Sequence, residues 1–143
     1  MNVATGGEKA LALVADDEPD ILALVSLRLR EVGLEVVTAR DGREALDLIA
    51  ERPPDLLVLD VRMPLMDGYD VTRAVRAGAE TRRIPILLLS ASIKDEQIPD
   101  GFEAGADAYL RKPFAAKELQ ETARALLEGR RPVLGRRKDA RVP

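Results

Sequence analysis

Four short apolar runs in the sequence each end on side chains that could do chemistry. Asp16 and Asp17 follow the first of these runs, and Asp60 follows another. Ser90 and Lys112 follow two later runs. If the runs are parallel strands of one sheet, their carboxyl ends lie on one rim, where ligands gather in such sheets. We therefore expect these five side chains to share one crevice.

The three aspartates of this crevice indicate a bound cation. Carboxylates that lie close together raise one another's pKa unless positive charge is placed among them. A lysine such as Lys112 supplies part of that charge, and a hard divalent ion would supply the rest. Mg²⁺ prefers oxygen ligands and is commonly held by one or two carboxylates with phosphate oxygens, so the set predicts a magnesium site.

The same residues fit a phosphoryl transfer. Such a transfer needs a nucleophilic oxygen, a cation that bridges the moving oxygens, and further groups that absorb negative charge. The Asp60 carboxylate is the candidate nucleophile and would form an acyl phosphate. Lys112 would neutralise one phosphate oxygen, and the Ser90 hydroxyl would donate a hydrogen bond to another.

The elements that must position these residues follow an alternating plan. Short apolar runs alternate with amphipathic stretches, which is typical of βα units around a parallel sheet. The expected strands are residues 10–15, 35–39, 56–59, 84–89 and 108–111. The expected helices are residues 19–32, 41–52 with Asp41 as cap, 68–77 and 115–127, with a short, late-starting helix that has Pro99 in its first turn. The predicted fold is α/β, a doubly wound, flavodoxin-like sheet of five parallel strands in the order 2-1-3-4-5.

Composition limits the remaining chemistry. The chain of 143 residues has no cysteine and no histidine, which excludes disulfides, thiolate metal sites and a phosphohistidine on the chain itself. Any phosphohistidine donor must therefore be another molecule. The apolar runs are too short to cross a bilayer, and residues 1–9 lack a signal-peptide pattern, so we expect a cytoplasmic protein without membrane contact.

Four stretches of the sequence resemble the receiver domain of bacterial response regulators. They are ALVADDEPD at residues 12–20, LLVLDVRMPLMDGYD at 56–70, ILLLSA at 86–91 and GADAYLRKPF at 105–114. The resemblance extends over residues 11–128, and it is specific because separate motifs occur in order at the expected strand ends. It implies a two-component signalling switch whose chemistry is limited to accepting a phosphoryl group and slowly losing it to water.

The resemblance implies roles for the residues of the crevice. Asp60 would be the phosphoacceptor. Asp17 would bind Mg²⁺ directly, together with Asp60 and the backbone carbonyl of Arg62, whereas Asp16 would act on the metal through water. The side chain of Arg62 stands two residues after the acceptor and would lie close to the phosphate.

Three further residues would carry the signal according to the same resemblance. Lys112 would pair with the phosphate, and a cis peptide bond to Pro113 would aim it into the site. Ser90 would be the switch hydroxyl. Tyr109 would be the aromatic residue whose rotamer follows phosphorylation.

The resemblance also implies two kinds of partner. The phosphoryl donor would be a sensor histidine kinase or a phosphotransfer protein. A downstream protein would bind the face formed by the fourth helix, the fifth strand and the fifth helix. Pro99 and Gly101 fall in that fourth helix, and both residue types disfavour a long, regular helix.

The expected organisation is a receiver domain at residues 9–128 and a basic, flexible tail at residues 129–143. The tail is rich in arginine although the net charge of the chain is −3. Too few residues follow Glu128 for a DNA-binding or enzymatic domain. We therefore expect a stand-alone regulator or a part of a larger one, with no nucleic-acid binding by this chain alone.

Simpler interpretations exist for each residue taken singly. Asp16 and Asp17 would cap the first helix, Asp60 would belong to a turn, Ser90 would satisfy a strand-end backbone group, and Lys112 would be a solvated charge. Together these readings require four coincidences on one rim.

The alternative functions are a receiver-like scaffold that is never phosphorylated and an Asp-nucleophile, Mg²⁺-dependent phosphatase. Such a phosphatase resembles haloacid dehalogenases and would want an aspartate where Arg62 stands. A flavin-binding domain fits less well, because the chain is only 3% aromatic.

Overall fold

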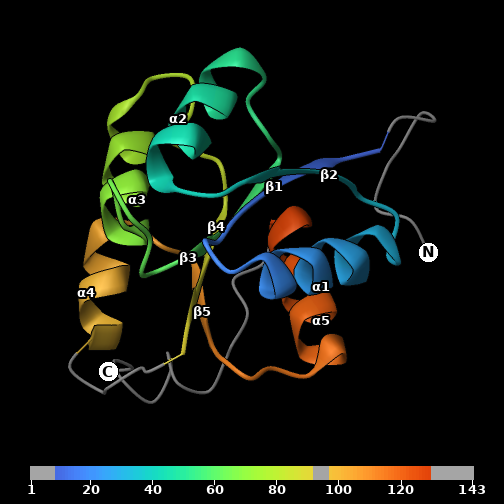
Figure 1. The fold of residues 1–143 in the computed structure, drawn as a ribbon. Helices are drawn as coiled ribbons and strands as arrows, with labels where there is room; N and C mark the ends of the chain where they lie inside the picture. The colour runs from blue at the N-terminus through green and yellow to red at the C-terminus, as the bar shows by residue number, and fades with distance from the viewer. Residues whose placement is uncertain (1–8, 92–96, 130–143) are drawn as a thin grey trace, which may run out of the picture.

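A computed structural model describes residues 9–91 and 97–129, and the described chain forms five helices around a five-stranded parallel sheet (Figure 1). The strands are β1 (Leu11–Ala15), β2 (Glu35–Ala39), β3 (Leu56–Asp60), β4 (Ile86–Ser90) and β5 (Ala108–Arg111). The helices are α1 (Pro19–Arg30), α2 (Gly42–Glu51), α3 (Gly68–Ala77), α4 (Gln97–Ala104) and α5 (Ala116–Leu127). The strand order is β2-β1-β3-β4-β5, which confirms the predicted fold class.

Helices cover both faces of the sheet. Alternate residues of β1 point to opposite sides: Ala12 and Val14 belong to the core on the side of α1 and α5, whereas Leu13 and Ala15 belong to the core on the side of α2 and α3. Figure 1 shows the same two layers, with α4 beside α3. A strand buried on both faces needs apolar side chains at nearly every position, which explains the unbroken apolar runs of β1, β3 and β4.

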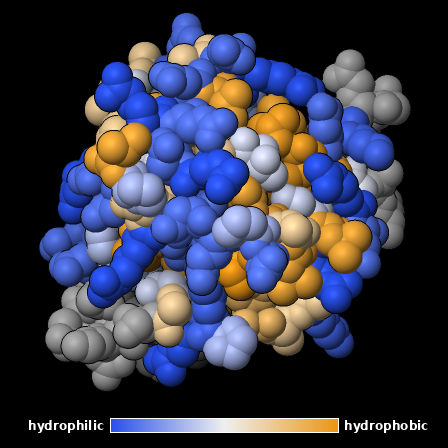
Figure 2. Space-filling view, viewed as in Figure 1, coloured by the Kyte–Doolittle hydropathy of each residue, from blue (hydrophilic) through white to orange (hydrophobic). Residues whose placement is uncertain are grey.

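The surface contrasts with this core. In the space-filling view, hydrophilic residues cover most of the visible face, and hydrophobic residues show in patches between them (Figure 2). No helix within residues 9–91 and 97–129 is long and apolar enough to cross a membrane.

The strand register brings the residues of interest to one edge of the sheet. Ala15 of β1 pairs with Leu59 of β3, so the residues that follow each of them lie side by side. Asp60 is the last residue of β3 and pairs with Leu89, while Ser90 ends β4. The carboxyl ends of β1, β3 and β4 therefore meet on one rim, as the alternating pattern predicted.

The start of α3 lies against the end of β3. Asp67 and Asp70 form a capping box that fixes the first turn of this helix. A β-carbon on Gly68 would lie 2.5 Å from the backbone oxygen of Asp60, so only glycine permits this approach. The Gly68 amide also donates to the Val61 carbonyl at 2.9 Å. Residues 61–67 therefore form a loop that leaves the end of β3 and returns beside it.

Most predicted boundaries agree with the structure, and the differences have local causes. The expected strand at residues 84–89 begins two residues later, because the Ile84 amide bonds to Thr81 in a turn and Pro85 has no amide hydrogen. Helix α1 ends two residues early, at a turn in which Gly33 has a φ of 95°. Helix α4 is short and contains Pro99 in its first turn, as predicted. The predicted tail falls outside the described residues except for Gly129.

Candidate functional site

The three aspartates predicted to share a crevice do lie together. One carboxylate oxygen from each of Asp16, Asp17 and Asp60 falls within 4.8 Å of the others. Asp16 and Asp60 are buried, with 0% and 5% of their surfaces exposed, whereas Asp17 is exposed at the mouth of the crevice. Hard oxygen donors at this spacing are the ligands that Mg²⁺ prefers, so these residues fit the predicted ion.

Lys112 reaches into the same crevice from the end of β5. Its Nζ lies 2.9 Å from Asp16 Oδ2 and 3.0 Å from Asp60 Oδ1. A longer contact of 3.5 Å joins Nζ to the exposed Glu18. The Lys112 side chain is only 8% exposed, and the peptide bond that follows it is cis, as the resemblance implied. Lys112 is therefore a buried cation between two buried carboxylates, not a solvated charge.

The protonation of the crevice follows from burial and from these contacts. Burial raises the pKa of Asp60 to about 6, the hydrogen bond from Lys112 opposes that change, and the charges of Asp16 and Asp17 add to it. Burial alone would lower the pKa of Lys112, but its hydrogen bonds to Asp16 and Asp60 outweigh burial and raise that pKa. Lys112 thus stays charged at neutral pH. Asp60 is mostly ionised there as well, although burial makes its charged form less favourable than in water.

Asp16 has a second contact that supports part of the simpler interpretation. Its Oδ1 accepts a hydrogen bond of 2.9 Å from the backbone amide of Glu18. Glu18 itself is the cap residue of α1, and its side chain makes no capping bond, while Pro19 begins the helix. Asp16 therefore shapes the start of α1 with one oxygen and binds Lys112 with the other.

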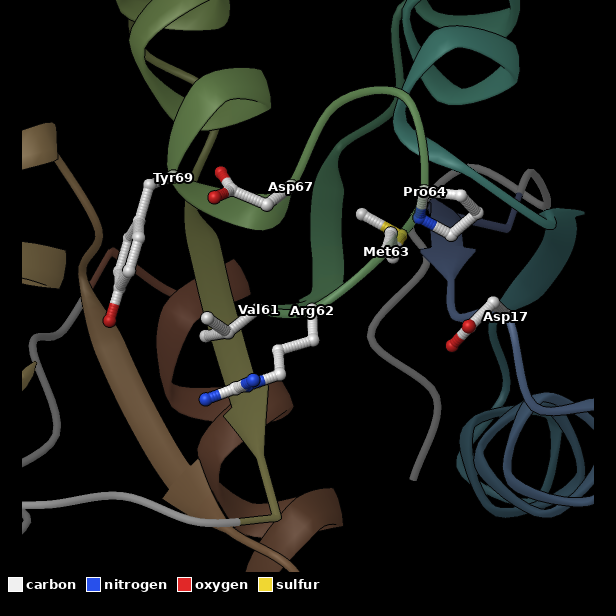
Figure 3. A pocket seen from close by; sticks show the side chains of 7 residues that line it. All are labelled: Asp17, Val61, Arg62, Met63, Pro64, Asp67 and Tyr69. Carbon is white, nitrogen blue, oxygen red and sulfur yellow. The ribbon is translucent and has the colours of Figure 1, made fainter.

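An open pocket of about 550 Å³ adjoins the crevice. Its lining comes from the turn after β1 and from the segment between β3 and α3, and comprises Asp17, Val61, Arg62, Met63, Pro64, Asp67 and Tyr69. Figure 3 shows Asp17 on one side of this pocket and Tyr69 on the other. The Arg62 side chain extends away from Asp17, toward the side that Tyr69 lines.

A match to known proteins agrees with this geometry. Residues 12–124 match the model of a family described as the response regulator receiver domain. The chain belongs to this family. The resemblance seen in four short stretches of sequence is thereby confirmed.

Receiver domains of known structure share the fold over nearly their whole length. A response regulator from Chloroflexus aurantiacus has a TM-score of 0.82 and 38% identity, and the match covers 85% of this chain and 99% of that one. The chemotaxis response regulator CheY4 of Vibrio cholerae has a TM-score of 0.75 and 38% identity, with coverage of 79% and 94%.

The curated relatives are longer proteins. The transcriptional regulatory protein PrrA of Mycobacterium tuberculosis is 44% identical over 126 residues, which is 88% of this chain and 53% of PrrA. The transcriptional regulator RpaA of Synechocystis is 40% identical over 115 residues, which is 80% of this chain and 48% of RpaA. This receiver domain therefore spans about half the length of the curated relatives it matches.

Besides Lys112, the two other residues predicted to carry the signal, Ser90 and Tyr109, are both buried. Ser90 ends β4 with 3% of its surface exposed, and its carbonyl accepts a hydrogen bond of 2.8 Å from the Lys112 amide. Tyr109 lies in β5 with 2% exposed and packs in the core on the α3 side of the sheet. The structure thus places Ser90 at the same rim as Asp60, and Tyr109 in the neighbouring strand of the same sheet.

Sequence reasoning missed one residue that contacts this set. The Tyr69 hydroxyl, from the first turn of α3, lies 2.7 Å from the Tyr109 hydroxyl. The two residues are 40 positions apart, so no local pattern joins them. The one sequence feature that could have pointed to Tyr69 is its position directly after Gly68, where the chain returns to the end of β3.

Proposed function

We propose that this receiver domain is a phosphorylation-dependent switch that accepts a phosphoryl group on Asp60 with the help of Mg²⁺. The observation that supports this proposal most strongly is the crevice itself. Asp60 is a buried carboxylate whose oxygen lies 3.0 Å from a buried lysine, and two further carboxylates lie within 4.8 Å of it. Lys112 alone cannot neutralise three carboxylates, so the cluster fits a site that takes up a further cation, as an acceptor of phosphoryl groups requires.

The acceptor step is a displacement at phosphorus. A carboxylate oxygen of Asp60 would form a bond to phosphorus while the phosphorus–nitrogen bond of a phosphohistidine breaks. The electron pair of that bond stays on the imidazole nitrogen, which then takes up a proton. Because this chain has no histidine, the donor would be a sensor histidine kinase or a phosphotransfer protein.

Cations must offset the charge that this step brings into the crevice. Mg²⁺ would neutralise the moving oxygens, held by Asp17 and Asp60 directly, by the backbone carbonyl of Arg62, and by Asp16 through water. Lys112 would turn one of its hydrogen bonds from a carboxylate to a phosphate oxygen. Such a change needs only a small movement, since Nζ already lies 3.0 Å from Asp60.

The signal would then pass to the surface through Ser90 and Tyr109. Phosphorylation adds about −1.5 to −2 charges at the rim. The Ser90 hydroxyl would move to donate to the phosphate, and Tyr109 would follow between two positions. The proposed output surface is the face of α4, β5 and α5, which a downstream protein would bind.

The two alternative functions, a phosphatase and an unphosphorylated scaffold, fit the crevice less well. A phosphatase that uses an aspartate nucleophile wants an acid two residues after it, and Arg62 stands there. A scaffold that is never phosphorylated would have no use for Lys112 between two buried carboxylates, which is an arrangement that costs desolvation.

The test is the intact mass of the protein after incubation with acetyl phosphate, with and without Mg²⁺. The wild type is expected to gain one phosphoryl group only with Mg²⁺, and Asp60→Asn is expected to gain none while remaining folded. Asp47→Asn is the matched control, because Asp47 is an exposed aspartate on α2 and should leave uptake unchanged. Normal uptake by Asp60→Asn would show that the acceptor has been assigned wrongly.

A further inference from the structure

The two tyrosines of the chain are hydrogen-bonded to each other. Their hydroxyl oxygens lie 2.7 Å apart, one from α3 and the other from β5. Burial raises the pKa of both hydroxyls, so both keep their protons at neutral pH and one donates to the other. Tyr69 and Tyr109 are the only tyrosines among the 143 residues, and the chain has no tryptophan.

Tyr69 belongs to two neighbourhoods at once. It is half-buried and lines the pocket beside the acceptor, together with Arg62 and Asp67. In Figure 3 its side chain stands on the side opposite Asp17. Its hydroxyl reaches Tyr109, which lines no part of the pocket. A change in the pocket can therefore reach Tyr109 through a single side chain.

The ring of Tyr109 occupies a space that α4 leaves for it. A β-carbon on Gly101 would lie 2.6 Å from Tyr109 Cε2 and 3.1 Å from Leu88 Cδ1. Only glycine at this position lets α4 approach the ring so closely. The Phe102 ring packs beside it, with centroids 6.2 Å apart and planes tilted by 59°. Gly101 therefore has a packing reason to stand inside a helix that it weakens.

The inward position of Tyr109 depends on both neighbours. A phenol hydroxyl in the core is unfavourable unless another polar group satisfies it, and the Tyr69 hydroxyl does so. The ring also needs the gap at Gly101. Neither contact involves Asp16, Asp17, Asp60 or Lys112, so both act on Tyr109 whatever the charge in the crevice is.

We propose that Tyr69 is a positioning residue that holds Tyr109 inward against Gly101 and so links the acceptor pocket to α4. This inference rests on the proposed function in one respect, namely that Tyr109 takes part in the switch. Loss of the Tyr69 hydroxyl loosens Tyr109, and a side chain at position 101 expels its ring. The equilibrium between inward and outward Tyr109 is then set by α3 and α4 as well as by phosphorylation.

Fluorine NMR of protein made with 3-fluorotyrosine tests the inference, because the two tyrosines give two resonances. Tyr69→Phe and Tyr109→Phe each remove one resonance and assign the other. In Tyr69→Phe the Tyr109 resonance is expected to move toward the position of exposed tyrosine. The outward population should rise about threefold to tenfold, which is the factor that one hydrogen bond of ordinary net strength is worth.

A second variant tests the packing half of the inference. Gly101→Ala is expected to move the Tyr109 resonance further than Tyr69→Phe does, because the new β-carbon occupies the place of the ring. Glu103→Ala is the matched control on the same helix, since Glu103 is exposed. It should leave both resonances in place.

The outcomes separate this inference from the proposed function. Phosphoryl uptake, measured by mass in the same samples, should persist in Tyr69→Phe and Gly101→Ala, because neither residue belongs to the crevice. If the wild type takes up no phosphoryl group, the proposed function fails while the NMR result still decides whether Tyr69 positions Tyr109. An unchanged Tyr109 resonance in Tyr69→Phe or in Gly101→Ala would overturn the inference.

Discussion

The acidic crevice and the tyrosine pair each contribute one residue, Asp17 and Tyr69, to opposite sides of one pocket, and the two groups are held together by different forces. The crevice contains buried charges, with Lys112 between Asp16 and Asp60 at 2.9 and 3.0 Å. The pair contains one neutral hydrogen bond of 2.7 Å and close packing against Gly101. Charges respond strongly to metal, phosphate and pH, whereas packing responds to shape. The crevice and the pair should therefore respond to different perturbations, the first to charge and the second to the shape of its neighbours.

The largest effect on stability is expected when the lysine of the crevice is removed. Lys112→Ala would leave Asp16 and Asp60 as buried carboxylates without a cation beside them, which typically costs about 3 kcal/mol of unfolding free energy. We expect this loss in urea denaturation at neutral pH. Mg²⁺ should restore part of the stability, because a divalent ion also neutralises the carboxylates. The variant should therefore still bind Mg²⁺, and its switching should be weakened more than its Mg²⁺ binding. Lys117→Ala, at an exposed site on α5, is the control, and an equal loss there would contradict the argument.

The next largest effect is the stabilisation by Mg²⁺, which should depend on the crevice and not on the tyrosine pair. An ion that binds the folded state alone stabilises it by about 2.7 kcal/mol at a concentration of 100 times its Kd. We expect Mg²⁺ to raise the Tm of the wild type and to raise that of Asp17→Asn much less at the same concentration. The Tyr69→Phe variant should respond to Mg²⁺ as the wild type does. An equal response from Asp17→Asn would show that the ion binds elsewhere.

The pH dependence of stability reports the contribution of the Asp60 carboxyl within the crevice. Its folded-state pKa of about 6 lies above the ordinary value of 3.8, so the folded protein binds more protons than the unfolded one between these values. In metal-free buffer, the contribution of Asp60 to stability therefore falls as pH rises from about 4 to 6 and then levels.

The measured quantity is the difference in unfolding free energy between Asp60→Asn and the wild type. This difference should grow in favour of the variant across that range, by an amount on the order of 1 kcal/mol because solvent at the rim screens the charges. A difference that stays constant from pH 4 to 7 would contradict the raised pKa.

The smallest effect concerns the tyrosine pair and its independence from charge. Tyr69→Phe removes the neutral hydrogen bond to Tyr109, which should lower the unfolding free energy by about 1 kcal/mol. Because no ion pair is involved, the loss should be the same in low salt and in 1 M NaCl. The loss caused by Lys112→Ala should instead change with salt. A salt-dependent loss in Tyr69→Phe would mean that the pair is coupled to the charges of the crevice.

The sequence predicted most of the fold because its signals are local. Four apolar residues before Asp60 indicate a strand covered on both faces, and Pro19 and Gly33 delimit a helix that the structure contains. The position of Lys112 at the rim followed from the same reasoning, since parallel strands end together. Errors of two residues arose where turns compete with strand or helix, as at Ile84.

The sequence could not predict contacts that depend on side-chain direction. The sequence placed Lys112 among the aspartates, but it did not predict that Asp16 Oδ2, 96 residues away, would lie 2.9 Å from Lys112 Nζ. The bond between Tyr69 and Tyr109 is of the same kind. All the assigned roles stay predictions, namely those of Asp60, Lys112, Ser90 and Tyr109, of the Arg62 carbonyl and of the metal ligands.

The measurement that tests the central claim most directly is the location of the phosphoryl group. After incubation with acetyl phosphate and Mg²⁺, borohydride reduces an aspartyl phosphate to an alcohol, and peptide mass spectrometry then locates the converted residue. We predict conversion of Asp60 alone in the wild type and in Asp47→Asn. Conversion at Asp16 or Asp17, or no conversion at any residue, would contradict the assignment of Asp60 as the phosphoacceptor.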